Sequence, residues 1–156
     1  MTVGNHTSFD ICADFDSGNI DVLDISNPLQ ALLAIRPDTR SPHFQWFHFK
    51  VSGLHVGQEH WFRLTNASQS SYNKAWTGYQ AVASYDHVNW FRVPTIFEGD
   101  ALRFNLEATQ THAWFAYFEP YSRGRHDWLI DQALTKAGTE SVSYTHLRAH
   151  ETLRYL

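Results

Sequence analysis

The amino-acid sequence predicts an all-β fold, an antiparallel two-sheet β-sandwich followed by one helix near the carboxyl end. Short runs rich in aromatic and β-branched residues recur along most of the chain, turn-forming residues separate them, and helical periodicity appears only after the last run. A doubly wound sheet would need helices between its strands, so this order favours a sandwich. With 156 residues, 43% hydrophobic and 18% charged, the chain suffices for one domain with its own core.

The first strands are predicted from alternation and from turn residues. Apolar residues alternate strictly in residues 8–15, and the turn-forming residues 16–19 that follow indicate a hairpin. Residues 19–25 and 30–36 are the next two predicted strands, separated by Pro28, whose missing amide proton and fixed φ interrupt a β-ladder. The composition of residues 30–36 is also compatible with a short helix.

Residues 43–51 are predicted to form a central strand. Phe47 and Phe49 share one face of it, and large side chains also occupy the alternate positions, which is typical of a strand covered on both sides. Residues 59–65 form the next predicted strand. The polar run that follows, residues 66–73, indicates an exposed loop.

Four further strands are predicted after this loop. They comprise residues 79–85, 89–93, 101–108 and 113–118. Turn-forming residues lie between them at positions 86–89 and 98–100, which makes the pattern one of many short, regularly interrupted strands.

Helical periodicity begins after Ser122. Acidic residues occur early and a lysine late in this segment, and Gly138 is placed to end a helix. The apolar residues that recur at helical spacing are Ile130, Ala133, Leu134 and Ala137. We therefore expect a sandwich domain at residues 1–121 and a helical connector at residues 122–140 that leads to a second domain.

Composition and charge exclude several classes of protein. The net charge of -4 and a pI near 6.2 leave no broad basic surface, so we expect no nucleic-acid partner. The polar start has no signal-peptide pattern, and no apolar run approaches the roughly 18 residues of a membrane span, so we expect no membrane partner. Cys12 is the single cysteine, which excludes an internal disulfide and fits a reducing cytoplasm.

The last residues carry a different kind of pattern. Residues 141–152 read SVSYTHLRAHET, and this run resembles the translation of a transposon-end sequencing adapter. We therefore expect the natural reading frame to break off near Ser141 and residues 141–156 to form a non-native tail. The alternative is a genuine amphipathic tail, which an unbroken native coding sequence through these residues would establish.

Several phrases of the sequence occur together in an order that is typical of one family. They are FDSGN at 15–19, LAIRPD at 33–38, FQWFHFKV at 44–51, SYNKAWTGY at 71–79, ASYD at 83–86, WFRVPT at 90–95 and FAYFEPYS at 115–122. No single phrase is decisive, but the ordered set resembles the amino-terminal domain that precedes the catalytic domain in cytosolic carboxypeptidases, a branch of the M14 metallopeptidases.

The resemblance implies a β-sandwich that packs against a zinc-bearing catalytic domain, which removes residues from the carboxyl ends of peptides or protein tails. Such an enzyme holds zinc with two histidines and a glutamate, the first two in a His-x-x-Glu motif. None of the ten histidines here has a glutamate at that spacing. We therefore expect no catalytic residue, no metal ligand and no cofactor in this chain, with zinc in the missing catalytic domain of a parent metallocarboxypeptidase.

Two groups of residues are candidates for binding. Large side chains with directional donors at the end of the last strand and the start of the helix are expected to dock the catalytic domain in cis, and the alternative is an ordinary exposed connector. These residues are Phe118, Pro120, Tyr121, Arg125 and His126.

A second candidate is an exposed aromatic loop that contains Tyr72, Trp76 and Tyr79. Such a loop would suit a stand-alone β-sandwich module that binds a peptide or a glycan on aromatic platforms, which is the rival to the carboxypeptidase interpretation. Most of the tryptophans at positions 46, 61, 90 and 114 lie in alternating strands, where packing in the core is the simpler explanation.

Overall fold

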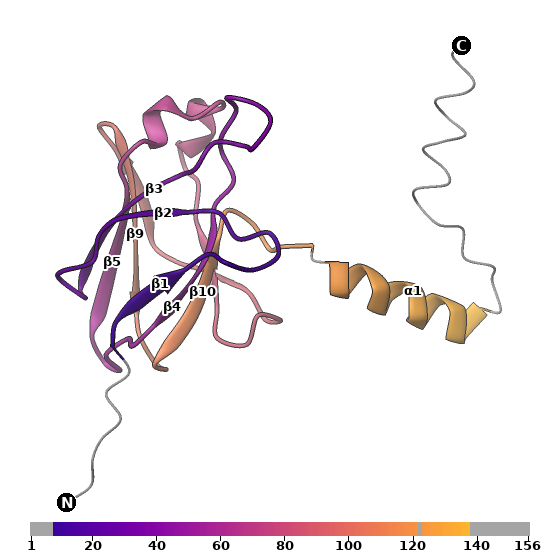
Figure 1. The fold of residues 1–156 in the computed structure, drawn as a ribbon. Helices are drawn as coiled ribbons and strands as arrows, with labels where there is room; N and C mark the ends of the chain where they lie inside the picture. The colour runs from indigo at the N-terminus through magenta and orange to yellow at the C-terminus, as the bar shows by residue number, and fades with distance from the viewer. Residues whose placement is uncertain (1–7, 122, 138–156) are drawn as a thin grey trace, which may run out of the picture. The chain divides into compact units, whose positions relative to one another are not determined.

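The structure is a computed structural model that describes residues 8–121 and 123–137 (Figure 1). It divides into two compact units, Met1–Pro120 and Tyr121–Leu156. The first unit holds every described strand, and the second holds the described α-helix. The predicted tail at residues 141–156 lies outside the described residues.

The first sheet has five strands in the order β1-β4-β10-β6-β7, and all its neighbours run antiparallel. Its strands are β1 (Asp10–Cys12), β4 (His48–Ser52), β6 (Val82–Ser84), β7 (Phe91–Arg92) and β10 (His112–Ala116). The predicted central strand corresponds to β4, which begins later than expected and lies between β1 and β10.

The second sheet has five strands in the order β2-β3-β5-β9-β8. Its strands are β2 (Asp21–Asp24), β3 (Gln30–Ala34), β5 (Glu59–Leu64), β8 (Thr95–Glu98) and β9 (Ala101–Glu107). β3 and β5 run parallel, whereas the other pairs are antiparallel. The chain leaves β3, passes through β4 of the other sheet and returns in β5 beside β3.

The all-β sandwich predicted from the sequence is therefore confirmed, with one parallel pair in place of a fully antiparallel arrangement. The segment 30–36, which was also compatible with a helix, forms strand β3. Strand β8 was not predicted from the sequence. It is a short edge strand directly after Pro94, with alternately exposed positions.

The hairpin predicted at residues 16–19 is wrong, because β1 and β2 belong to different sheets. The chain crosses between the sheets here, and Asn19 fixes the crossing. Its backbone forms an isolated bridge with His48, and its side-chain amide donates to the carbonyls of Arg36 and Trp46 at 2.9 and 2.8 Å. Gly18 is required in this crossing, since a Cβ there would lie 2.1 Å from the carbonyl oxygen of Ala13.

The core between the two sheets is dominated by phenylalanine. Residues that alternate toward the interior from both sheets meet there, and ring centroids lie 4.6 to 6.4 Å apart. The fully buried rings are Phe47, Phe49, Phe62, Phe104 and Phe115. This arrangement follows directly from the alternation seen in the sequence.

The segment predicted as an exposed loop, residues 66–73, is partly ordered and partly buried. It contains the 3-10 helix Ala67–Gln69 and the start of a second one, Asn73–Trp76. Ala67 and Ser70 are buried. The loop therefore closes one end of the sandwich core.

The helix of the second unit, α1, comprises Arg123–Ala137. The predicted carboxyl-terminal helix is thus confirmed, and Gly138 lies outside the described residues. Several of its apolar side chains are exposed, among them Trp128 at 59% and Leu129 at 42%. Within the described residues no helix is long and apolar enough to cross a membrane.

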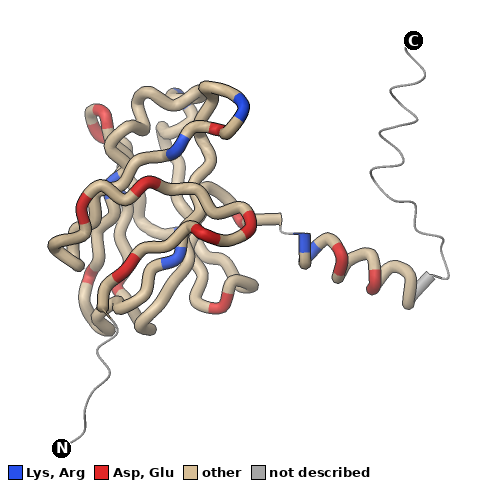
Figure 2. The backbone as a smooth tube through the Cα atoms, viewed as in Figure 1, with Lys and Arg blue, Asp and Glu red and all other residues tan. Residues whose placement is uncertain are grey.

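Figure 2 shows the basic residues scattered along the sandwich, with no broad basic region in this view. This distribution agrees with the charge balance of the sequence.

Candidate functional site

The outer face of the first sheet carries a cluster of histidines and aromatic rings. His48 lies on β4 and points away from the core, opposite in phase to its neighbours Phe47 and Phe49. We call the group the histidine–aromatic cluster, and it consists of Phe15, Trp46, His48, His87, Trp90, Trp114 and Phe118.

His48 is the centre of this cluster. Its ring contacts Phe15, Trp46 and Trp90 edge-on, with centroids 4.9, 5.9 and 5.8 Å away. It is fully buried although it faces outward from the sheet, because the segments around Phe15 and Trp90 cover it. Aromatic rings thus cover the outward-facing His48, in agreement with a central strand that is covered on both sides.

The polar atoms of His48 are satisfied by two partners. Its Nδ1 lies 3.0 Å from Ser17 Oγ, and its Nε2 lies 3.2 Å from Nε2 of His87. Burial, reinforced by the neighbouring His87, lowers the pKa of His48 to about 4, against the opposing effects of Ser17 and Asp16. His48 is therefore neutral at neutral pH.

His87 sits at the solvent side of the cluster, in a left-handed backbone conformation with φ of 62°. The side chain of Asp86 fixes the turn that carries His87. Asp86 Oδ1 accepts hydrogen bonds from the backbone amides of Val88 and Asn89 at 2.9 and 2.7 Å. These bonds hold the pKa of Asp86 well below its usual range, whereas burial lowers the pKa of His87. The His87 ring stacks on Trp114 at 5.1 Å.

The residues predicted to dock a second domain divide between the two units. Phe118 is 56% exposed and packs on Trp46 at 4.9 Å, so it extends the histidine–aromatic cluster toward the end of the sandwich. Pro120 is buried. Tyr121 and His126 belong to the second unit, where the Tyr121 hydroxyl lies 3.1 Å from His126 Nδ1.

Arg125, the remaining predicted docking residue, is an exposed residue of α1.

Of the histidine–aromatic cluster, only Phe118 was predicted from the sequence as a candidate site residue. The available signal was the presence of Trp and His at the outward positions of strands whose inward positions were already apolar.

The prediction of an exposed aromatic loop is wrong for two of its three residues. Trp76 is 1% exposed, and its Nε1 donates to the carbonyl of Ala67 at 2.9 Å and to Ser70 Oγ at 2.8 Å. Tyr79 is half-buried and its hydroxyl donates to a backbone carbonyl, while burial raises its pKa. Tyr72 alone of the three is exposed, at 70%. An exposed Trp76 platform was therefore a wrong prediction, because the ring closes the core.

The part of the chain that the structure describes contains no group of three or more His, Cys, Asp and Glu side chains placed to hold a metal ion. The histidine pair at the centre of the cluster is enclosed by rings rather than by further donors. The two histidine rings are therefore placed to pack against the aromatic rings around them.

Comparisons with known proteins identify the domain. Residues 11–118 match the model of the cytosolic carboxypeptidase N-terminal domain. The chain is 39% identical over 128 residues to the uncharacterized protein ZMO1242 of Zymomonas mobilis, covering 82% of this chain and 33% of that protein.

Solved structures agree with this match. A metallo-carboxypeptidase from Pseudomonas aeruginosa superposes with a TM-score of 0.81 at 57% identity, over 86% of this chain and 36% of that one. A metallo-carboxypeptidase from Burkholderia cenocepacia gives 0.78 at 36% identity, over 83% and 34%. The chain thus spans about a third of the length of these relatives. This chain belongs to the family of amino-terminal domains of M14 cytosolic carboxypeptidases.

Proposed function

We propose that this chain is the non-catalytic amino-terminal part of a longer zinc metallocarboxypeptidase and that its sandwich packs against and positions the catalytic domain. The parent would remove residues from the carboxyl ends of peptides or protein tails in the cytoplasm. The zinc would belong to the catalytic domain, and the described residues offer no donor set for it.

One observation carries the docking role: Phe118, at the exit from the sandwich, packs on Trp46 of the histidine–aromatic cluster. The exposed Phe118 ring is thereby continuous with the rings of the cluster. At neutral pH the central histidine of the cluster is neutral, and the ammonium of the neighbouring Lys50 lies 5.0 Å from the Trp114 ring centroid, so covering this face buries no histidine charge. Aromatic residues of this kind dominate the cores of protein interfaces.

In the sandwich unit, the proposed docking surface is the outer face of β4 and β10 together with Phe118. Of the other residues predicted from the sequence, Pro120 is buried, and Tyr121, Arg125 and His126 of the second unit remain separate docking candidates. The connector would comprise residues 122–140, followed by the adapter-derived tail at residues 141–156.

The first test is to sequence the source DNA past the codon for Ser141. A reading frame that continues into a domain with His-x-x-Glu and a later histidine supports the proposal. A natural stop shortly after Gly138 would favour a stand-alone module that binds a peptide or a glycan, although the burial of Trp76 removes one aromatic platform from that alternative.

The second test measures docking itself. The catalytic domain encoded by the continuing frame is produced separately and titrated with this chain in a calorimeter. Phe118→Ser is expected to weaken binding by at least about tenfold, as for an aromatic interface anchor. Val22→Ser changes a 40% exposed residue of the other sheet and serves as the matched control, for which unchanged binding is expected. Equal binding by both variants would refute this surface.

A further inference from the structure

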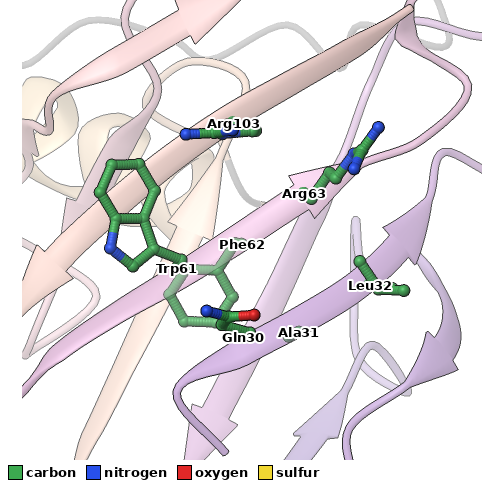
Figure 3. A pocket seen from close by; sticks show the side chains of 7 residues that line it. All are labelled: Gln30, Ala31, Leu32, Trp61, Phe62, Arg63 and Arg103. Atoms are coloured by element: carbon green, nitrogen blue, oxygen red, sulfur yellow. The ribbon is translucent and has the colours of Figure 1, made fainter. Parts of the chain in front are cut away.

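Two arginines face each other on the outer face of the second sheet. Arg63 on β5 and Arg103 on β9 are direct register partners in an antiparallel pair (Figure 3). Like charges directly opposite each other destabilise a sheet. An anionic partner between them would relieve this repulsion.

The nearby carboxylates supply little of that compensation. Glu98 approaches Arg103 at 3.9 Å, at the limit of an ion pair, and both side chains are largely exposed. Within the described residues, no ion pair is formed by Arg63. Glu59 is engaged elsewhere, since its carboxylate accepts hydrogen bonds from Trp61 Nε1 at 3.1 Å and from the side-chain amide of Asn105.

The same bonds make Trp61 a fixed platform for one of the arginines. With its indole nitrogen held by Glu59, the ring supports the Arg103 guanidinium, whose central carbon lies 5.3 Å from the ring centroid. Stacking of this kind orients a guanidinium at a small cost in solvation. Arg103 is therefore held in place before any ligand arrives.

A hollow of about 330 Å³ lies over these residues and extends across β3, β5 and β9. Gln30 on β3 lines it beside Trp61, its register partner, and contributes an amide that can donate or accept. Leu32 provides an apolar border next to Arg63. Figure 3 shows the two guanidiniums, the indole and the amide on the same side of the sheet.

We propose that this hollow binds a carboxylate group of an acidic peptide, with Arg63 and Arg103 as the anion ligands and Trp61 as the floor. A carboxylate matches the planar fork of a guanidinium and forms paired hydrogen bonds with it. Because the hollow is open and crosses three neighbouring strands, it accommodates an extended segment rather than an enclosed small molecule. The site lies on the opposite sheet from the proposed docking surface, so both can be occupied together.

The experiment is a titration of the isotopically labelled full chain, followed by amide chemical shifts. The probe is an acetylated and amidated peptide that carries three aspartates, and the matched peptide carries three asparagines. We expect the aspartate peptide to shift the amides around residues 30–32, 61–63 and 103, and the asparagine peptide to leave them in place. Equal shifts from both peptides, or no shifts at all, would overturn the proposal.

Three variants separate recognition from general attraction. Arg63→Ala is expected to weaken binding by about tenfold or more, as for loss of a charge-assisted pair. Arg63→Lys keeps the charge but loses the fork and should recover only part of the affinity. Arg40→Ala removes the same charge from an exposed turn and should bind like the unchanged chain. A loss with Arg40→Ala equal to that with Arg63→Ala would contradict a specific site.

Folding and the identity of the anion are checked in parallel. Arg63→Ala relieves a like-charge contact, so its melting temperature should be unchanged or higher, and reduced binding cannot then be ascribed to unfolding. Inorganic phosphate is titrated as a competitor. Phosphate that binds as tightly as the aspartate peptide would overturn the carboxylate assignment, whereas weaker competition supports it.

Discussion

Replacement of His48 tests the electrostatics of the histidine–aromatic cluster. His48 is fully buried, and its pKa is lowered from 6.5 to about 4, first by burial and then by His87. Between these two pH values the unfolded chain binds a proton at this histidine and the folded chain does not. The free energy of unfolding must therefore rise with pH across this window and level off above about pH 6.5.

The size of the effect follows from the two pKa values. At pH 5 the unfolded histidine is protonated, because this pH lies about 1.5 units below its pKa of 6.5, while the folded histidine remains mostly neutral. Each pH unit of this difference corresponds to about 1.4 kcal/mol of stability. The chain should therefore lose about 2 kcal/mol of stability at this site between pH 7.5 and pH 5. His48→Gln retains a polar side chain near Ser17 and His87 but cannot titrate, so it should lack this part of the pH dependence.

The assay is equilibrium unfolding in urea, followed by circular dichroism at pH 7.5 and pH 5 for both proteins. The quantity of interest is the difference between their pH dependences, which cancels the other titrating groups. His87→Gln removes the smaller of the two causes that lower the pKa, so it should reduce the effect without abolishing it. If the unchanged chain and His48→Gln lose equal stability on acidification, the description of a neutral buried His48 is refuted.

Two further substitutions test packing inside the sandwich. Gly18→Ala would place a Cβ 2.1 Å from the Ala13 carbonyl oxygen, so the crossing between the sheets must move, and we expect a loss of about 2 kcal/mol in urea unfolding. Trp76→Phe leaves Ser70 Oγ and a buried carbonyl without their indole donor and creates a void, and calorimetric melting should show a loss of about 2 kcal/mol.

Matched controls lie on the helix of the second unit. Apart from its chain neighbours and the backbone of its own helix, no described residue has an atom within 4 Å of a Cβ built at Gly124, and Trp128 is 59% exposed. Gly124→Ala and Trp128→Phe should change the unfolding free energy of the sandwich by less than about 0.5 kcal/mol. If these two variants lose as much stability as Gly18→Ala and Trp76→Phe, the losses at Gly18 and Trp76 cannot be ascribed to their local packing.

Local alternation predicted most strands, because it reports which face of a segment is buried. It did not predict the pairing of strands, which depends on distant residues. The turn residues 16–19 are common in hairpins, but the side chain of Asn19 reaches Arg36 and Trp46 and directs the chain into the other sheet. Strand β8 escaped notice because Pro94 and its exposed alternate positions resemble a loop.

The candidate site was predicted only at its edge. Phe118 stood out as a large ring after the last strand, but recognising the cluster required β4 and β10 to be neighbours and the segment around His87 to fold over them. The burial of Trp76 was hidden for a similar reason. A tryptophan among polar residues is typical of a surface loop, and only its two buried acceptors reveal that the loop closes the core.

The two outer faces of the sandwich differ in what surrounds a central cation. Each face carries a cation at a central position. On the first sheet Lys50 is the register partner of Trp114, and its ammonium lies 5.0 Å from the ring centroid, so an aromatic face stabilises the charge. On the second sheet Arg63 is the register partner of another arginine.

This difference implies that the first face is complete without an anion, whereas the second is not. A protein surface can cover the first face without supplying charge, and the second face selects a ligand that does supply it. The two proposed roles should therefore separate in one pair of variants. Phe118→Ser should weaken docking of the catalytic domain and leave peptide binding intact, and Arg63→Ala should do the reverse. Loss of both activities in either variant would mean that the faces are coupled and that one of the two assignments is wrong.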